Sequence, residues 1–259
     1  MKLLFIPDTQ VKVGVNIDHI KALGNYILDK KPDIIVCIGD WWDMPSLSSY
    51  EKKGSRYFEG LRYRDDVEAG LEAMESLFKP LNEYNAMRVR NRKKPYRPRL
   101  VYTEGNHENR ISRALNEDPR LIGTIGFDDF KLESFGFETY RFLEIIEIEG
   151  VAFSHYFINP DSLTGSVVTG SIENKLKLIG QSFVMGHQQS RQYGNRYSGL
   201  GREIHGLVLG AFYSHSEDYM NPQGNRQHWR GICMMHELRD GRYDPSFVSL
   251  DFLTRKWLS

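Results

Sequence analysis

Several residues that could bind a metal ion or transfer a proton follow directly after a short apolar run at residues 100–103. They are Asn106, His107 and Glu108, which offer an amide oxygen, an imidazole and a carboxylate, and they come after Gly105. Glycine lets the chain turn sharply or approach a ligand closely, and an imidazole can transfer protons near neutral pH. Taken alone, the stretch is equally compatible with an ordinary strand-to-helix turn in which Asn106 or Asn109 caps the helix.

Four other apolar runs end in the same kind of residue. They lead to Asp8 and Gln10, to Asp40 and Asp43, to His155, and to His187 and Gln189. This pattern is typical of buried strands in a sheet flanked by helices, where ligands bind beyond the carboxyl ends of the strands. We therefore expect all five strand ends to converge on one site.

The elements that must position these residues follow from hydrophobic periodicity. Residues 16–31 show helical spacing, stop at Pro32 and precede a strand at 33–38, which predicts a parallel βαβ unit. Further helices are predicted at 64–87, kinked or broken at Pro80, at 109–117 and at 172–179. A hairpin is expected at Glu149-Gly150, and runs at 203–212, 229–238 and 246–253 predict a mainly β remainder.

Composition narrows the broad class of protein. The 259 residues contain 34 basic and 34 acidic side chains, so overall charge does not indicate attraction to nucleic acid or to membranes. The N-terminal apolar run is too short for a signal peptide, and no segment approaches the length of a membrane helix. We expect a soluble, cytoplasmic protein with no membrane partner, folded as one domain over residues 1–259. Cys37 and Cys233 are expected to be buried thiols.

Together, the motifs resemble those of the calcineurin-like metallophosphoesterase family. They are Asp8-x-Gln10, Gly39-Asp40-x-x-Asp43, Gly105-Asn106-His107-Glu108, His155 and Gly186-His187-x-Gln189, in the family's order and spanning residues 8–189. The resemblance implies an α/β fold, a β-sandwich of two mixed sheets flanked by helices (α/β/β/α). It also implies a site for two divalent metal ions.

The resemblance further implies roles for individual residues. The metal ligands would be Asp8, Gln10, Asp40, Asn106, His155, His187 and Gln189. Asp40 would bridge the two ions, His107 would protonate the leaving oxygen, and Asp43 would orient His107. The family has histidines where this chain has Gln10 and Gln189, and amide oxygens suit hard cations better than late transition metals. We therefore expect Mn²⁺, with Mg²⁺, Zn²⁺, Ni²⁺ or Fe as alternatives, and His205 or His215 could replace a missing histidine.

The expected reaction is hydrolysis of a phosphoester by a water that two metal ions activate. Protein phosphatases of the family carry an arginine that clamps a phosphate dianion, whereas this chain has Met44 and Pro45 at that place. This difference favours a nuclease-like phosphodiesterase acting on a nucleotide, DNA or RNA. Arg110 and Arg113 could supply a clamp instead, which leaves a phosphomonoesterase for small metabolites as an alternative. A metal-binding module with weakened activity is a second alternative, because two expected ligands are changed.

Two biased segments bear on the substrate. Residues 88–99 are rich in arginine and lysine, and residues 41–58 are rich in aromatic side chains, which would suit a phosphodiester backbone and stacked bases. An equally good interpretation is a solvated connection and core aromatics. The stretches 215–219 (HSEDY) and 222–225 (PQGN) resemble those of phage- or prophage-borne members of the family.

Overall fold

The computed structural model describes residues 1–259 except 50–51, 53, 217–222, 224–226 and 259. Parts of the aromatic segment 41–58 and most of the two phage-like stretches lie outside the described residues. Within the described part of the chain, no helix combines the length and the apolar character that crossing a membrane requires.

The first sheet is built on four parallel strands. In spatial order the sheet contains β11 (Arg242–Ser249), β10 (Gly231–Arg239), β1 (Leu3–Ile6), β2 (Ile34–Cys37), β3 (Arg99–Thr103) and β4 (Phe137–Tyr140). Strands β1 to β4 are parallel, and β10 pairs antiparallel with both β1 and β11. The helix α1 (Asp18–Lys30) connects β1 to β2. The predicted βαβ unit is therefore confirmed.

The second sheet brings two more strand ends to the same region. Its order is β5 (Ile146–Ile148), β6 (Val151–Phe153), β7 (Ser182–Met185), β9 (Glu203–Val208) and β8 (Gln192–Tyr197). The hairpin between β5 and β6 turns at Glu149 and Gly150, as predicted, and both have positive φ. Strands β6, β7 and β9 run parallel.

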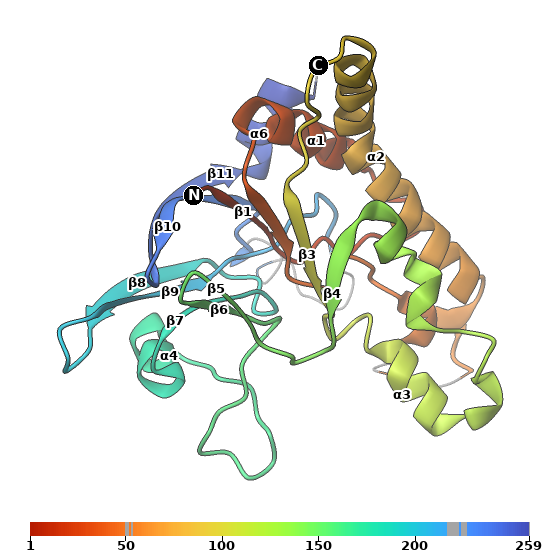
Figure 1. Cartoon of the computed structure of the whole chain (residues 1–259). Helices are drawn as coiled ribbons and strands as arrows, with labels where there is room; N and C mark the ends of the chain where they lie inside the picture. Colours follow the sequence, from red (N-terminus) through yellow and green to blue (C-terminus); the bar gives the residue numbers. More distant parts are fainter. Residues whose placement is uncertain (50–51, 53, 217–222, 224–226, 259) are drawn as a thin grey trace.

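Three buried clusters define four layers (Figure 1). The two sheets pack face to face through side chains such as Phe5 and Phe153, whose ring centroids lie 6.4 Å apart. Helices α1, α2 (Tyr63–Arg90) and α6 (Leu250–Trp257) cover the outer face of the first sheet. Helix α4 (Ile172–Ile179), found where it was predicted, covers the second sheet. The predicted α/β/β/α sandwich is confirmed.

The structure corrects two details, the break that was one of the two alternatives at Pro80 and the end of the strand predicted at 246–253. Helix α2 continues through Pro80 without a break, and Gly24 of α1 lies close to the Pro80 ring, where a Cβ atom would come within 3.1 Å of Cγ. Packing against α1 therefore keeps the helix continuous despite the missing N–H group. The run at 246–253 is a strand only as far as Ser249, whose hydroxyl caps α6 by accepting from the Phe252 backbone N–H at 3.3 Å.

Candidate metal centre

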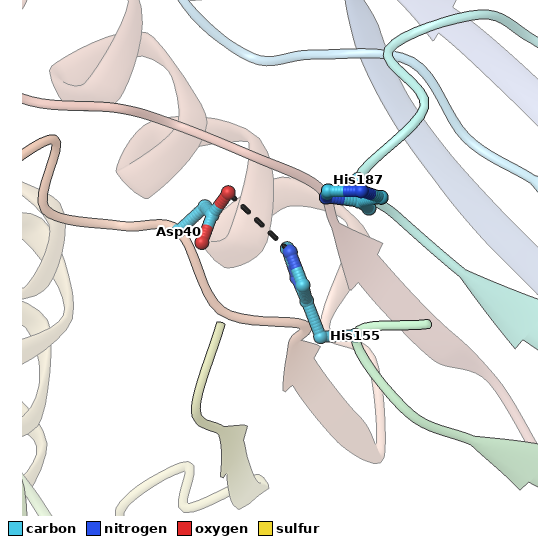
Figure 2. A group of neighbouring side chains, drawn as sticks. All are labelled: Asp40, His155 and His187. Carbon is cyan, nitrogen blue, oxygen red and sulfur yellow. Dashed lines mark ion pairs between the residues drawn. The ribbon is translucent and has the colours of Figure 1, made fainter. Parts of the chain in front are cut away.

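The carboxyl ends of β1, β2, β3, β6 and β7 meet at one place, as the sequence pattern predicts. His155 Nε2 lies 3.0 Å from Asn106 Oδ1 and 3.4 Å from Asp40 Oδ2. Figure 2 shows Asp40, His155 and His187 converging from three separate loops. The backbone N–H of His187 donates to Asp8 Oδ1 at 3.0 Å, which ties the first and fifth strand ends together.

The backbone at this site is held in an unusual conformation. Four non-glycine site residues adopt positive φ, namely Gln10 (45°), Asp40 (50°), His187 (64°) and Gln189 (54°). Such residues cost free energy and persist only where the surrounding structure fixes them, commonly at functional sites. The neighbouring glycines are required by contact, since a Cβ on Gly105 would collide with the Asp40 carboxylate and one on Gly186 with that of Asp8.

Glu108 holds the Asp40 loop in place. Its buried carboxylate accepts hydrogen bonds from four donors, which are the backbone N–H groups of Asp40 (2.9 Å), Trp42 (3.0 Å) and Gly105 (2.8 Å) and the hydroxyl of Tyr102 (2.9 Å). These contacts bind the loop after β2 to the loop after β3. Glu108 therefore positions the backbone that carries Asp40.

We expect Glu108→Ala to lower the free energy of unfolding by roughly 3–5 kcal/mol, because four buried donors would lose their acceptor. Urea unfolding of the metal-free protein measures the loss. Glu75→Ala, which removes an exposed carboxylate from α2, is the matched control. A loss below about 1 kcal/mol, the size expected for an ordinary surface change, would contradict this role.

The donor atoms fit a cation. Within the described residues, one ligand atom from each of Asp40, His155 and His187 lies within 4.8 Å of the other two. His155 Nδ1 donates to the carbonyl of Ile38 at 2.9 Å, which directs Nε2 into the centre. Asp8 Oδ2 and Gln10 Oε1 are buried, and neither has a hydrogen-bond partner in the described part of the chain. Buried oxygens without partners are costly unless a cation occupies the space they face.

Neighbouring charges shift the pKa values of His155 and Asp40 in opposite directions. Burial by itself would lower the pKa of His155, but the carboxylates of Asp40 and Asp8 and the Ile38 carbonyl raise it to about 9. Burial likewise opposes ionisation of Asp40, yet His107 and His155 hold its pKa below the ordinary value. The His155 imidazolium thus places a positive charge where a metal ion would bind.

Metal binding is therefore expected to release a proton from His155, because a ligating imidazole must be neutral. His155 has a pKa of about 9 and Asp8 one that burial raises to about 7, so apparent Mn²⁺ affinity should rise by about tenfold per pH unit between about pH 7 and pH 9, where only His155 releases its proton. Calorimetric titration in two buffers of different ionisation enthalpy counts the released proton. A pH-independent affinity would contradict the charge state assigned to His155.

His107 lies beside this centre and is fixed by Asp43. Its Nδ1 is 2.8 Å from the backbone oxygen of Asp43 and 2.9 Å from Oδ1, while its Nε2 lies 3.8 Å from Asp40 Oδ2. Burial would lower the pKa of His107, but Asp40 and the hydrogen bond to Asp43 raise it overall. Lys12, which no motif singled out, forms an ion pair with Asp43 Oδ2 at 3.3 Å.

Arg110, which follows the stretch Gly105-Asn106-His107-Glu108, is buried rather than open to a substrate. Arg110 donates to the backbone oxygens of Asp43 and Met44 at 2.8 and 3.0 Å, and its Nη2 lies 3.3 Å from His107 Nε2. Only 5% of Arg110 is exposed. Two of its N–H groups are thus directed at the chain itself, next to the expected acid.

Gln10 and Gln189, which stand where the family has histidines, follow β1 and β7. Gln189 Oε1 accepts a hydrogen bond from the Tyr213 hydroxyl at 3.0 Å, a contact that no sequence pattern predicted. His215 stacks on the Tyr213 ring with centroids 4.6 Å apart. His205 cannot replace a missing ligand, because it lies near the start of β9, away from the carboxyl ends of the strands. Its Nδ1 forms a hydrogen bond with the Tyr193 hydroxyl at 2.9 Å.

The aromatic segment 41–58 and the basic segment 88–99 were candidates for substrate binding, but their described residues have mainly structural positions. Trp41 and Trp42 are fully buried and donate from their indole N–H groups to Gly70 and Val67 of α2, so they are not available for base stacking. The basic segment 88–99 lies at the amino end of β3, opposite the end that leads to Asn106 (Figure 1). Arg99 there pairs with Glu138 at 2.7 Å.

Comparison with known proteins identifies the family. The sequence model of the calcineurin-like phosphoesterase family matches residues 1–215. No curated protein sequence matches the chain. Among solved structures, the chain is similar to YfcE, a phosphoesterase from E. coli, at 13% identity and a TM-score of 0.42, covering 96% of this chain and 100% of that one. It is also similar to TT1561 from Thermus thermophilus, at 10% identity and a TM-score of 0.32, covering 95% and 98%.

The family match covers far more than half of the chain, and it includes all five strand ends of the candidate metal centre. The chain belongs to the calcineurin-like phosphoesterase family.

Proposed function

We propose that this protein is a metal-dependent phosphodiesterase with a two-metal centre, acting on a nucleotide or nucleic-acid phosphodiester. The observation that carries the proposal is the position of His107, which Asp43 orients at 2.9 Å within reach of Asp40, a member of the metal-ligating cluster. A protein that only bound metal would have no use for a buried, carboxylate-oriented imidazole beside the ions.

The proposed metal ligands divide into two groups, one for each ion. Asp40, Asn106, His155 and His187 would hold one ion, and Asp8, Gln10 and Gln189 would hold the second together with Asp40. When bound, two divalent ions lower the pKa of a water molecule and neutralise charge that develops on the phosphoryl oxygens. Asp40 and the hydrogen bond to Asp43 raise the pKa of His107, which favours its charged form as the general acid for the leaving oxygen.

The preference for a diester is supported by what surrounds His107. The arginine clamp of the protein phosphatases is replaced by Met44 and Pro45, and the Met44 side chain is buried in the core while its backbone oxygen accepts from Arg110. Because Arg110 is directed at Asp43 and Met44, it is poorly placed to clamp a dianion. A diester carries one negative charge and needs no such clamp.

The choice of metal follows from the half-site that contains glutamine. Its donors are a carboxylate oxygen of Asp8 and amide oxygens, and Gln189 Oε1 already accepts from Tyr213. Oxygen donors favour Mn²⁺ or Mg²⁺ over Zn²⁺. We infer that this half-site binds its ion more weakly than the half-site that contains His155 and His187.

The test is hydrolysis of matched nitrophenyl mono- and diesters by chelator-treated protein refilled with Mn²⁺, Mg²⁺, Zn²⁺ or Ni²⁺, with metal content measured in parallel. Metal-dependent hydrolysis that favours the diester is the expected result. Preference for the monoester would support a phosphomonoesterase and overturn the diester assignment. Absence of both activity and bound metal would instead favour the weakened binding module that Gln10 and Gln189 suggest.

A further inference from the structure

A cavity of about 320 Å³ is lined by helix α3 (Arg110–Glu117) and by residues 46–49, Gly54 and Phe58. The described residues that line it include Ser46, Ser49, Phe58, Arg110 and Arg113. Arg110 belongs both to the cavity wall and to the surroundings of His107, since its Nη2 lies 3.3 Å from His107 Nε2. The cavity therefore adjoins the surroundings of His107 through Arg110.

One wall of this cavity carries two guanidinium groups. Arg110 and Arg113 are three residues apart on α3, so they project from the same face of the helix. Arg110 is 5% exposed, and its Nε has no hydrogen-bond partner among the described residues. Arg113 donates to the Ser49 hydroxyl at 3.1 Å and forms no ion pair with any described residue.

The remaining lining indicates what kind of group would enter. Glu117, the last residue of α3, and Asp118 after it also line the cavity, and the Asp118 carboxylate is paired with Arg120 at 2.7 Å. Asp43 Oδ1 lies 3.9 Å from Arg110 Nη1 and offsets that charge, so the positive charge offered to an anion is that of Arg113, next to serine hydroxyls that can donate. Phe58, which is half-buried, adds an apolar surface next to these donors. Positive donors with one apolar wall suit a phosphate attached to a sugar or base.

We propose that this cavity binds a phosphate group carried by the leaving group of the substrate, with Arg113 as its main ligand. The inference rests on the proposed function, because it assigns the cavity to the leaving group that His107 protonates. In the reaction, water adds to the scissile phosphorus, the bond to the leaving oxygen breaks, and that oxygen takes the proton from His107. The second phosphate remains intact and serves only to position the substrate.

The test compares thymidylyl-thymidine with its 5′- and 3′-phosphorylated forms, using metal-loaded protein. One of the two phosphorylated dinucleotides carries its extra phosphate on the leaving nucleoside. We expect the kcat/KM for this substrate to exceed that for the unphosphorylated dinucleotide by roughly tenfold or more, because one charge-assisted hydrogen bond can provide such a factor. In Arg113→Ala this ratio should fall to about one, mainly through KM, because the contact is made equally before and in the transition state.

Two further variants make the comparison specific. Arg113→Lys should restore part of the ratio, since a point charge still attracts phosphate without the bidentate geometry. Arg255→Ala, which removes an exposed arginine from α6, should leave the ratio unchanged. A ratio of about one in the wild-type protein, or a ratio that survives in Arg113→Ala, would overturn the proposal. An Arg113→Ala effect confined to nitrophenyl monoesters would assign Arg113 to the scissile phosphate and would also overturn it.

Failure of the proposed function can be told apart from failure of the cavity. Wild-type protein that hydrolyses no diester with any metal contradicts the phosphodiesterase, and the cavity is then tested by binding of thymidine 3′,5′-bisphosphate to the metal-loaded protein. Arg113→Ala should weaken that binding roughly tenfold. Equal dissociation constants for the wild type and Arg113→Ala would overturn the cavity assignment.

Discussion

His107→Ala is expected to slow hydrolysis of a diester with a poor leaving group by roughly 10²–10⁴-fold, the usual contribution of a positioned general acid. Metal content should stay unchanged, because His107 lies outside the cluster of Asp40, His155 and His187 that could hold a metal ion. Steady-state kinetics on an alkyl diester, together with elemental analysis, measures both quantities.

The identity of the leaving group provides an internal control for this prediction. Nitrophenolate departs readily without a proton, so the loss in His107→Ala should be much smaller on a nitrophenyl diester. His236→Ala, which removes an imidazole from β10, should change neither rate. Equal losses on both leaving groups would argue against proton donation by His107, and full activity on the alkyl diester would refute its role altogether.

Asp40→Asn is expected to weaken metal binding by at least roughly 100-fold and to abolish activity, since even supporting residues of metal sites cost 10- to 100-fold. Asp40 Oδ2 lies 3.4 Å from His155 Nε2 and 3.8 Å from His107 Nε2, and its Oδ1 accepts from the His107 backbone N–H at 2.9 Å. Asparagine tolerates the positive φ of 50° at this position, so the variant removes charge while keeping the loop conformation.

Thermal unfolding with and without Mn²⁺ provides a readout that does not depend on activity. Wild-type protein should be stabilised by Mn²⁺ because the ion binds only the folded chain, whereas Asp40→Asn should show little shift. Asp240→Asn, an exposed aspartate that also has a φ of 50°, is the matched control and should behave as the wild type. Retention of the Mn²⁺ shift in Asp40→Asn would mean that Asp40 is not the shared ligand.

The sequence by itself determined where the site lies and which fold carries it. Apolar runs that end in Asp8, Asp40, Asn106, His155 and His187 predict buried strands, and parallel strands bring their carboxyl ends to one edge. That reasoning is local, because each run and its terminal residues are adjacent in the chain. The order of the motifs then identified the family. The single-domain organisation and the roles of the individual ligands remain predictions.

Only the tertiary structure determined the features that depend on contacts between distant segments. Composition could not show that Trp41 and Trp42 pack under α2, or that the basic segment 88–99 lies at the end of β3 remote from the site. It could not show that Glu108 binds two loops together, or that Arg110 and Arg113 line one cavity. These features depend on side chains that meet only when the sheets and helices pack, and no spacing along the chain records which partners they meet.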